Sequence, residues 1–328
     1  MNVLVTGGAG YIGIHTVHAL MARGHNVVAL DDLSTGYRSS VPAKALIEGD
    51  IADEAMVSRV LAERRIEAVV HCAAKASVSD SVANPGPYFD ANIAKGITFL
   101  ECLRAHDVRR IVFSSSAGVY GDPERLPISE DDQKRPKSPY GLSKLIFEQM
   151  LEWYGKAYGL RYVALRYLCA AGAAPELGVG EDHRPEGHLI PSVLLSILGR
   201  RPPVEIYGTD YPTEDGTAIR DFVHVMDVAD AHTAALEHLA SGGESLILNV
   251  GLGRGFSVRQ VIEASERVTG RTASVTVAGR RPGDPAVLVA NPEALIRALG
   301  WKPRFSRLEE IIATAWEWHK LHPEGFAS

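Results

Sequence analysis

Short apolar runs alternate with longer amphipathic stretches through the first half of the chain. The runs at 2–6 (NVLVT), 26–32 (NVVALDD) and 161–167 (RYVALRY) are typical of buried strands. Apolar residues at helical spacing fill 12–24 (IGIHTVHALMARG) and 88–106. Strands that alternate with helices of ten or more residues predict βαβ units, and continuously apolar strands predict a sheet covered on both faces. We therefore expect an α/β fold built on a doubly wound, Rossmann-like parallel sheet.

The rhythm changes after about residue 170. A Gly- and Pro-rich stretch begins there, CAAGAAPELGVGEDHRPEGHLIP, and shorter elements lead to an amphipathic run at 308–321. We expect a first domain over residues 1–170 and a smaller α/β substrate domain over residues 171–328, with segments near 220–240 returning to the first. Ligands often bind in the cleft between two such domains, so we expect the functional site there.

Composition excludes several classes of protein. The 328 residues are 46% hydrophobic and 23% charged, as in ordinary globular proteins. The formal net charge is −6 and the basic pairs are scattered, so no nucleic-acid partner is expected. No apolar run approaches the length of a membrane span, and the N-terminus lacks the features of a signal peptide. We expect no membrane partner and a cytoplasmic location.

The cysteines and histidines show no metal-binding pattern. Cys72, Cys102 and Cys169 stand far apart without a CxxC pair, which is typical of reduced thiols in the cytosol. None of the twelve histidines forms an HExxH or Cys/His cluster, and His183 and His188 lie in a loop-like stretch. We interpret them as scattered surface histidines and expect no metal.

A glycine-rich turn follows the first strand. Residues 6–13, TGGAGYIG, place Gly7, Gly10 and Gly13 between that strand and the first helix. Such a loop lets the backbone approach a pyrophosphate, while the helix N-terminus supplies N–H groups and positive potential. Tight strand-to-helix turns need glycine as well, so the loop alone does not decide.

Acidic residues after the next strands favour a dinucleotide. Asp31 can accept hydrogen bonds from the adenosine ribose, and its charge would repel a 2′-phosphate, which favours NAD over NADP as the cofactor. Asp32 is an alternative for that role. Asp50, in EGDI, is a candidate adenine contact, with helix capping as the alternative.

The stretch 138–144, SPYGLSK, places Tyr140 and Lys144 on one face of a helix. A nearby cation favours a phenolate, so we expect Lys144 to lower the pKa of Tyr140 and make it a general base. A solvated surface pair is the alternative. Ser116 ends the run RRIVFSSS, at the edge where open α/β sheets bind ligands. Ser116 and Tyr140 are therefore expected to reach one substrate hydroxyl, with Lys144 also holding the nicotinamide ribose.

Through TGGAGYIG, SSSAGVYG and YGLSK the chain resembles the extended short-chain dehydrogenase/reductase superfamily. More narrowly, it is similar to the UDP-glucose 4-epimerase (UDP-galactose 4-epimerase) family through DYPTEDGTAIRDFVHVMDVADAH and RRPGDPA. The first three motifs are specific only to the superfamily, whereas the long stretch is distinctive of the epimerases. The resemblance runs from Met1 to the last helix.

The resemblance implies an NAD-dependent isomerase that interconverts UDP-glucose and UDP-galactose. Tyr140 removes the proton of the sugar 4-hydroxyl while hydride passes from C4 to tightly bound NAD; the 4-keto sugar then rotates and takes hydride back on its other face. The family also implies a homodimer formed through helices of the cofactor domain. Helices around 88–105 and 144–158 are candidates, although their apolar residues can equally face the sheet.

The resemblance also implies binding roles. The cofactor-side positions are Gly7, Gly10, Tyr11, Ile12, Gly13, Asp31, Asp32, Leu33, Ser34, Thr35, Gly36, Asp50, Ile51, Cys72, Ala73, Ala74, Lys75, Asn92, Ser114, Tyr140, Lys144 and Leu168. The substrate-side positions are Ser116, Tyr140, Cys169, His188, Leu189, Glu205, Ile206, Tyr207, Arg220, Arg281, Asp284 and Leu288. Arg220 and Arg281 match a diphosphate clamp, Asp284 a uridine ribose contact and 205–207 a uracil-binding strand. Either arginine can instead serve a structural ion pair.

Five positions depart from the family pattern or tune it. Cys169 stands where the family usually has asparagine, and a thiol is a poor hydrogen-bond partner. Leu168 replaces an aromatic residue beside the nicotinamide, His188 an asparagine of some relatives, and Lys75 is one position out of register with a lysine of others. Leu288 matches a position that gates the sugar pocket. Its intermediate volume predicts that UDP-N-acetylhexosamines are tolerated.

Three other functions stay open. A 4-epimerase of another UDP-sugar, such as UDP-xylose, UDP-arabinose or UDP-N-acetylglucosamine, needs the same residues. A nucleotide-sugar dehydratase shares the cofactor loop but uses an acid after the serine, where Ala117 and Gly118 stand here. A non-catalytic NAD-sensing module would be expected to lack the tyrosine, which is present.

Overall fold

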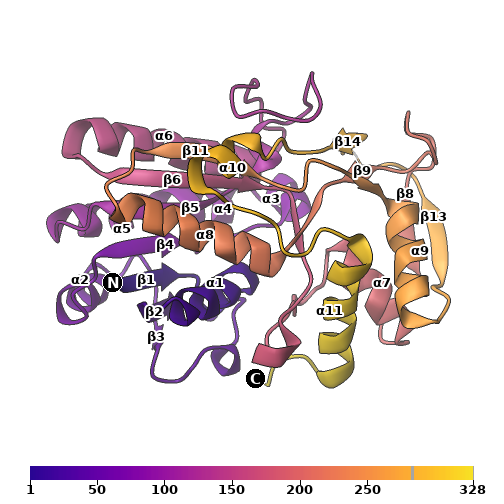
Figure 1. Ribbon diagram of the computed structural model, residues 1–328, viewed down its shortest axis with the longest axis horizontal. Coiled ribbons are helices and arrows are strands. Elements are labelled where there is room, and N and C mark those ends of the chain that lie inside the picture. The colour runs from indigo at the N-terminus through magenta and orange to yellow at the C-terminus, as the bar shows by residue number, and fades with distance from the viewer. Residues whose placement is uncertain (282–283, 328) are drawn as a thin grey trace.

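The computed structural model describes residues 1–281 and 284–327. Within them, seven parallel strands form the main sheet in the order β11-β6-β5-β4-β1-β2-β3 (Figure 1). Their bounds are β1 Asn2–Thr6, β2 Asn26–Asp31, β3 Leu46–Glu48, β4 Ala68–His71, β5 Arg110–Ser116, β6 Arg161–Tyr167 and β11 Leu246–Val250. The doubly wound, Rossmann-like parallel sheet expected from the sequence is confirmed.

Helices cover both faces of this sheet. One face carries α1 (Tyr11–Ala22), α8 (Val225–Ala240) and α10 (Glu293–Leu299), and the other carries α2 (Glu54–Glu63), α5 (Lys95–Ala105) and α6 (Pro139–Tyr158). Successive residues of a strand point to opposite faces. Val3 and Val5 accordingly pack into the first layer and Leu4 into the second. Burial on both faces explains why these strands lack polar alternation.

The chain reverses its direction of travel across the sheet at β1, which lies between β4 and β2. From β1 it proceeds outward to β2 and β3, and then returns to the other side to add β4, β5 and β6. In open α/β sheets, ligands bind in the crevice at the carboxyl ends of the strands beside such a switch point. The topology therefore places a binding crevice above β1 and β4.

The helix expected over 88–106 is divided into three parts. Helix α4 (Gly86–Phe89) leads into a π-helical turn, η2 (Asp90–Ala94), and then into α5. The turn contains Asn92, whose buried amide bonds the backbone N–H and carbonyl of Lys75 (2.8 and 3.0 Å) and the Ser143 hydroxyl (2.9 Å). Single π-helical turns are frequent at functional sites. Here the turn fixes the segment after β4 against α6.

Helix α6 carries clear signals at both ends. The Ser138 hydroxyl accepts a hydrogen bond from the Gly141 N–H at 3.1 Å, and Pro139 takes the first helical position. Gly159 ends the helix in the left-handed conformation, with φ of +72°. The SPYGLSK motif is thus the first part of a helix with a fixed start.

The smaller part of the chain contains three short sheets. Strand β10 (Phe222–His224) pairs with β7 (Cys169–Ala171), β9 (Ile219–Arg220) lies between β12 (Phe256–Ser257) and β14 (Val287–Leu288), and β13 (Val275–Ala278) pairs with β8 (Val204–Tyr207). Figure 1 shows α7 (Leu189–Ile197), α9 (Val258–Thr269) and α11 (Leu308–Leu321) grouped beside them.

Besides α10, helix α8 and strand β11 follow residue 170 and belong with the main sheet. Helix α8 packs against α1, β5 and β6, and β11 extends the sheet beyond β6. The remaining short helices are η1 (Arg38–Ser40), α3 (Val78–Ala83), η3 (Ala117–Val119) and η4 (Pro175–Leu177). The predicted domain boundaries themselves stay a prediction. In the part of the chain that the structure describes, no helix has the length and apolar character needed to cross a membrane.

Candidate active site

The carboxyl edge of the main sheet gathers most of the predicted cofactor-side residues. Residues 6–13 connect β1 to α1, 31–36 follow β2, 50–51 follow β3, 72–75 follow β4, and Ser114 lies near the end of β5. Parallel strands end at the same edge, so segments far apart in sequence become neighbours. This edge is the floor of the candidate site.

Two glycines of the β1–α1 loop are required by the fold itself. Gly7 has φ of +67°, and a Cβ there would lie 2.6 Å from the Ala73 nitrogen. A Cβ at Gly13 would lie 1.9 Å from the Gly7 carbonyl oxygen. At Gly10 the nearest atom to such a Cβ is 3.4 Å away, which is an ordinary contact. The fold does not need glycine at position 10, and the open space there, before the N-terminus of α1 at Tyr11, fits the phosphates of a dinucleotide.

The Asp31 carboxylate is hydrogen-bonded to this loop, whereas the Asp32 carboxylate bonds Ser34 instead. The buried Asp31 carboxylate accepts hydrogen bonds from the backbone N–H groups of Ala9 (2.9 Å) and Leu33 (2.8 Å), and burial raises its pKa. A carboxylate offers about four acceptor sites, so the ribose hydroxyls can still bind. The exposed Asp32 accepts from the backbone and hydroxyl of Ser34. The geometry favours Asp31 for the ribose contact.

Asp50 is paired with a lysine that the sequence interpretation missed. It forms an ion pair with Lys95, the first residue of α5, and accepts from the Ala52 N–H at 2.9 Å. Burial works to raise the pKa of Asp50, but Lys95 and the Ala52 N–H together outweigh burial and lower it. The helix-cap alternative for Asp50 is wrong, because Asp53 caps α2 through the Met56 N–H. The ion pair with Lys95 therefore holds the charged Asp50 carboxylate at the carboxyl edge of the main sheet.

Tyr140 and Lys144 lie over the end of β5. Lys144 is only 4% exposed, and its Nζ donates to the Ser114 carbonyl at 2.7 Å. The same Nζ lies 5.8 Å from the centre of the Tyr140 ring. The Ser116 hydroxyl caps the turn that follows β5 by accepting from the Gly118 N–H at 3.1 Å. The surface-pair alternative is wrong, since Lys144 is buried.

The protonation of this pair differs from the expectation. Burial raises the pKa of Tyr140 above its usual value, and the neighbouring Ser116 hydroxyl opposes the rise. Burial lowers the pKa of Lys144 to about 8. The expectation that Lys144 lowers the pKa of Tyr140 is therefore wrong for the chain by itself: burial dominates, and the ammonium group is directed to a backbone carbonyl.

A buried chain of hydrogen bonds lies behind Lys144. The Cys72 Sγ is 3.1 Å from the Ser114 Oγ, which is 2.7 Å from Nε2 of His232 in α8. The Val228 carbonyl, 2.8 Å from His232 Nδ1, can only accept, so Nδ1 carries the proton and Nε2 accepts from Ser114. Burial lowers the pKa of His232 to about 4, and the ring stays neutral. The sequence interpretation missed His232, although it lies in the distinctive DVADAH stretch.

One predicted diphosphate contact, Arg220, meets the predicted ribose contact, Asp284. Arg220 ends β9, beside Leu288 on the neighbouring strand β14. Its guanidinium forms an ion pair with Asp284 and donates to the Ile219 carbonyl at 2.7 Å. Burial raises the pKa of Cys169 to about 11, and Arg220 and Asp284 both act on it, which places this thiol close to the pair. Arg220 is thus engaged in the ion pair that the sequence left as its alternative role.

Arg281 lies against Tyr207 of β8, the predicted uracil-binding strand. The Arg281 guanidinium carbon lies 3.9 Å from the centre of the Tyr207 ring, and the Tyr207 hydroxyl donates to Glu205. The neighbouring Ile206 is buried in a small core cluster. Tyr207 therefore serves as a packing surface for the Arg281 cation at the end of β8.

Leu168 and Leu288 line the region next to Ser116. Both pack against a small cluster that contains Ala117 and Val119 of η3. This contact brings the predicted sugar gate to the end of β5.

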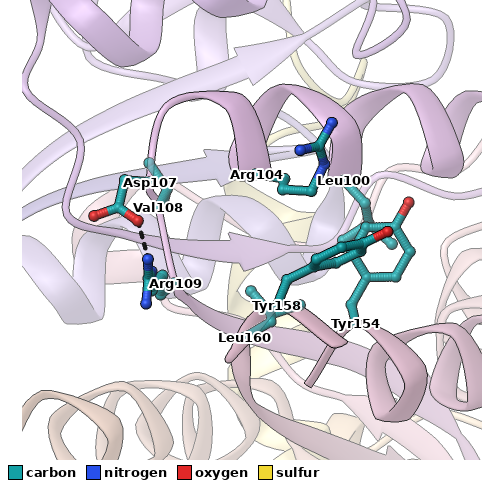
Figure 2. A pocket seen from close by; sticks show the side chains of 8 residues that line it. All are labelled: Leu100, Arg104, Asp107, Val108, Arg109, Tyr154, Tyr158 and Leu160. Carbon is teal, nitrogen blue, oxygen red and sulfur yellow. Dashed lines mark hydrogen bonds and ion pairs between the residues drawn. The ribbon is translucent and has the colours of Figure 1, made fainter. Parts of the chain in front are cut away.

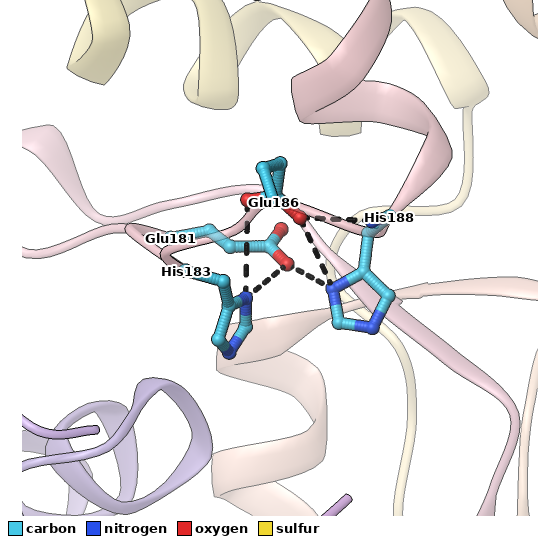
Figure 3. A group of neighbouring side chains, drawn as sticks. All are labelled: Glu181, His183, Glu186 and His188. Atoms are coloured by element: carbon cyan, nitrogen blue, oxygen red, sulfur yellow. Dashed lines mark hydrogen bonds and ion pairs between the residues drawn. The ribbon is translucent and has the colours of Figure 1, made fainter. Parts of the chain in front are cut away.

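Figure 3 shows that His188, before α7, faces the carboxylates of Glu181 and Glu186, which the sequence interpretation did not connect with it. The next residue, Leu189, packs into the core.

A buried ion pair stabilises α6 beneath the site. Arg166 of β6 and Glu148 of α6 are each 2% exposed, and Nε and Nη2 of Arg166 donate to the two carboxylate oxygens of Glu148. The Ser115 hydroxyl also donates to Glu148, at 2.5 Å, and Arg166 donates to the Tyr120 hydroxyl at 2.7 Å. Glu148 lies one turn beyond Lys144 and two turns beyond Tyr140 on the same helix. The network therefore holds the face of α6 that carries Tyr140 and Lys144 against β5 and β6.

Two cavities differ in their relation to this site. A cavity of about 30 Å³ lies at the glycine loop, between that loop and the segment around His183. A larger one, of about 280 Å³, lies away from the site between α5 and α6 (Figure 2). The larger cavity is lined by Leu100, Arg104, Asp107, Val108, Arg109, Tyr154, Tyr158 and Leu160. The smaller cavity is the one that borders the candidate site.

Comparisons with known proteins agree on one family. Residues 3–251 match the model of the NAD dependent epimerase/dehydratase family. A UDP-glucose 4-epimerase of Lacticaseibacillus casei is 47% identical over 327 residues, which cover 99% of each chain. The crystal structure of UDP-glucose 4-epimerase from Brucella ovis in complex with NAD has a TM-score of 0.94 and 45% identity, covering 96% of this chain and 97% of that one. The UDP-Glc/GlcNAc 4-epimerase of Campylobacter jejuni has a TM-score of 0.85 and 36% identity, covering 98% and 99%.

Proposed function

Since this chain belongs to the NAD dependent epimerase/dehydratase family and acts as an NAD-dependent UDP-glucose 4-epimerase, we propose that Tyr140, Lys144 and Ser116 form its catalytic centre. The observation that carries the proposal is the placement of Tyr140 and the buried Lys144 over the end of β5, beside Ser116. The residues of the cofactor edge fit a dinucleotide, because Gly10 leaves room for phosphates and Asp31 has acceptor sites left for a ribose.

The proton chemistry follows from this placement. Bound NAD⁺ supplies a hydride acceptor for the sugar C4 and a positive charge that favours the Tyr140 phenolate. Tyr140 takes the proton of the sugar 4-hydroxyl and returns it after the sugar has turned. Ser116, beside the phenol, holds the same hydroxyl by hydrogen bonding. Lys144, anchored on the Ser114 carbonyl, holds the cofactor ribose.

The nucleotide end anchors the sugar while it turns. In this proposal Arg220 exchanges part of its ion pair with Asp284 for the diphosphate, and Arg281 approaches it from the Tyr207 ring. Forked guanidinium donors match phosphate oxygens, and the Asp284 carboxylate can accept from ribose hydroxyls. A dehydratase is less well supported, because Ala117 and Gly118 follow Ser116 in η3 and supply no acid.

A direct assay tests the function. Purified protein incubated with UDP-galactose is expected to produce UDP-glucose, measured with a coupled dehydrogenase that oxidises UDP-glucose. The equilibrium should be reached from either sugar without added NAD if the cofactor is tightly bound. Absence of UDP-glucose from a preparation that contains stoichiometric NAD would contradict the proposed function.

Two glycine substitutions test the cofactor loop. Gly10→Ala is expected to leave the free energy of unfolding within about 1 kcal/mol of the native value, because no chain atom crowds a Cβ there. The added methyl group overpacks the phosphate cradle, and the Kd for NAD is expected to rise about 5- to 150-fold. Gly13→Ala should instead destabilise the fold, since its Cβ would overlap the Gly7 carbonyl.

NAD titrations by calorimetry and urea denaturation separate these effects. Gly86→Ala is the matched control, because no atom lies within 4 Å of a Cβ at that position. If Gly10→Ala bound NAD as tightly as the native chain, the phosphates would have to lie elsewhere.

We also propose that UDP-N-acetylhexosamines are substrates, with Leu288 at the gate. Leu288 lies beside Arg220 and packs with Leu168 near Ser116, where the substituted sugar would lie. Replacing Leu288 by tyrosine is expected to lower kcat/KM for UDP-N-acetylglucosamine by roughly tenfold or more, because a larger side chain removes volume from the pocket. UDP-galactose turnover, measured in parallel, should change far less. No turnover of UDP-N-acetylglucosamine by the unsubstituted chain would refute this substrate range.

We propose further that the protein is a homodimer in solution. Leu100 and Leu103 of α5 are buried in the core, but Ile97 and Trp153 on α5 and α6 are 46% and 66% exposed. Large exposed apolar side chains on α5 and α6, the two helices that contribute residues to the cavity of Figure 2, favour an interface formed by these helices. Sedimentation equilibrium should give about twice the chain mass of 35.4 kDa. A monomer at micromolar concentration would argue against this assembly.

We propose that the protein is located in the cytoplasm. All three cysteines are free in the structure, and burial raises the pKa of Cys72 and Cys169 to about 11. Protonated, unpaired thiols suit a reducing compartment. Cell fractionation followed by immunoblotting tests this, and enrichment in an extracellular or membrane fraction would contradict it.

A further inference from the structure

Four side chains before α7 converge on one point. Glu181, His183, Glu186 and His188 each offer one ligand atom, and these atoms lie within 4.8 Å of one another. Figure 3 shows both imidazoles turned with Nδ1 toward the two carboxylates. Nδ1 of His183 lies 3.0 Å from a Glu181 oxygen and 3.9 Å from a Glu186 oxygen. Nδ1 of His188 contacts the same Glu181 oxygen and lies 3.7 Å from Glu186.

Among the described residues, only imidazoles face the carboxylates of this cluster as ion-pair partners. The Glu181 and Glu186 side chains are 4% and 6% exposed. Within residues 1–281 and 284–327, neither carboxylate forms an ion pair with a lysine or an arginine, so the imidazoles are their cationic partners. Two buried carboxylates whose ligand atoms lie within 4.8 Å repel each other and need a compensating positive charge. The imidazoles supply that charge in the chain alone, and a divalent cation bound by all four groups supplies it in their place.

The distances suit such an ion. Zinc binds imidazole nitrogen and carboxylate oxygen at about 2.0–2.2 Å in a tetrahedron, which places neighbouring ligand atoms about 3.4 Å apart. The distances of 3.0, 3.7 and 3.9 Å between nitrogen and oxygen atoms bracket this value. Glu186 is already oriented, because its carboxylate accepts from the N–H groups of Gly187 and His188 at 2.8 Å. The hydrogen bond between His188 Nδ1 and Glu181 must break for an ion to enter, and the other nitrogen–oxygen distances are already close to those of a coordination shell.

Bringing these four side chains together costs little conformational entropy. All four residues come from the eight-residue stretch EDHRPEGH, so one short loop provides the complete set. Closing a short loop costs little conformational entropy compared with joining distant segments. The spacing E-x-H-x-x-E-x-H is not one of the familiar zinc motifs, which explains why the sequence showed only two scattered histidines.

We propose that Glu181, His183, Glu186 and His188 bind one divalent transition-metal ion of the Zn²⁺ type at a structural site. Four protein ligands leave no open position for catalysis. The site joins the loop to the start of α7 and to the cofactor edge, since the His183 ring lies 6.0 Å from the Tyr11 ring. His188 is 61% exposed, which gives the ion a path from solvent. In Figure 3 the second ring nitrogen of His188 points away from the cluster, so metal binding and a substrate contact are compatible.

Titration with zinc alone tests the site in the full-length protein. After dialysis against a chelator, with NAD retained, calorimetry is expected to show one Zn²⁺ bound per chain and a higher thermal unfolding midpoint in its presence. His183→Gln and His188→Gln should each lower the affinity by at least about tenfold, since even partners outside a ligand shell typically change it 10- to 100-fold. His106→Gln, on an exposed histidine after α5, is the matched control and should bind like the native protein.

Two results would overturn the proposal. One is the absence of stoichiometric zinc binding by the native protein, which does not depend on any variant folding. The other is unchanged zinc affinity in both His183→Gln and His188→Gln. Epimerase activity is not part of this test, so its outcome is independent of the proposed function.

Discussion

Tyr140→Phe is expected to lower kcat by about 10²- to 10⁴-fold, the contribution typical of one general acid–base group. The substitution removes the only atom of Tyr140 that can take the sugar proton and keeps the ring, which fills the same space over β5. Lys144 should retain its hydrogen bond to the Ser114 carbonyl, because that contact does not involve the phenol. NAD binding should therefore persist while turnover fails.

Steady-state turnover of UDP-galactose, with the NAD content of each preparation, measures this effect. Tyr158→Phe is the matched control, since Tyr158 lies on the same helix α6 and is 51% exposed. It should leave kcat close to the native value. Nearly full activity in Tyr140→Phe would show that another group takes the proton, even though the reaction itself occurs.

Glu148→Gln is expected to lower the free energy of unfolding by about 3–5 kcal/mol, the usual cost of removing one partner from a buried ion pair. Glutamine keeps the shape and can accept one hydrogen bond, but it leaves the buried Arg166 cation without its counter-charge. Burial works to lower the pKa of Arg166, and its contacts with Glu148 and Tyr120 raise it in the native chain. A guanidinium is effectively always protonated in proteins, so Arg166 remains charged in the variant. The Ser115 hydroxyl also loses its charged acceptor.

Urea denaturation followed by circular dichroism, at one fixed NAD concentration, provides the measurement. Glu152→Gln is the matched control: it lies one turn further along α6 and forms an exposed pair with Lys156, with side chains 52% and 57% exposed. Exposed pairs contribute about 0–1 kcal/mol. Equal destabilisation by the two substitutions would mean that burial of the Arg166 pair carries no special weight.

Local patterns predicted the strands at 2–6, 26–32 and 161–167, the first and last helices, and the position of α6. The run 308–321 became α11 with the same bounds, because its apolar spacing and its packing agree. The stretch 88–106 did not stay one helix. The π-helical turn at Asp90–Ala94 lets Asn92 bond Lys75 and Ser143, and both partners come from elsewhere in the chain. A pattern of neighbours along the sequence carries no information about such distant partners.

The residues of the candidate site also divide into those that local sequence predicted and those that depend on distant partners. Gly7, Gly13 and Asp31 were recognised because a strand–turn–helix unit is local, and its requirements are visible in consecutive residues. Lys95 beside Asp50 and His232 behind Ser114 were missed, since residues 45 and 118 positions apart meet only when the sheet has formed. The pKa of Tyr140 was misjudged for a related reason. Spacing showed its neighbour Lys144, but the depth of burial belongs to the folded chain.

The sequence by itself determined the parallel α/β sheet, the glycine loop and the tyrosine–lysine pair, because hydrophobic periodicity, turn chemistry and helical spacing act over a few residues. Only the tertiary structure decided which charges are buried together: Arg166 with Glu148, Arg220 with Asp284, and the Glu181–His188 cluster. The strength of an electrostatic interaction depends on the distance between two groups and on how far water is excluded from them. Both quantities exist only after distant segments have packed against one another.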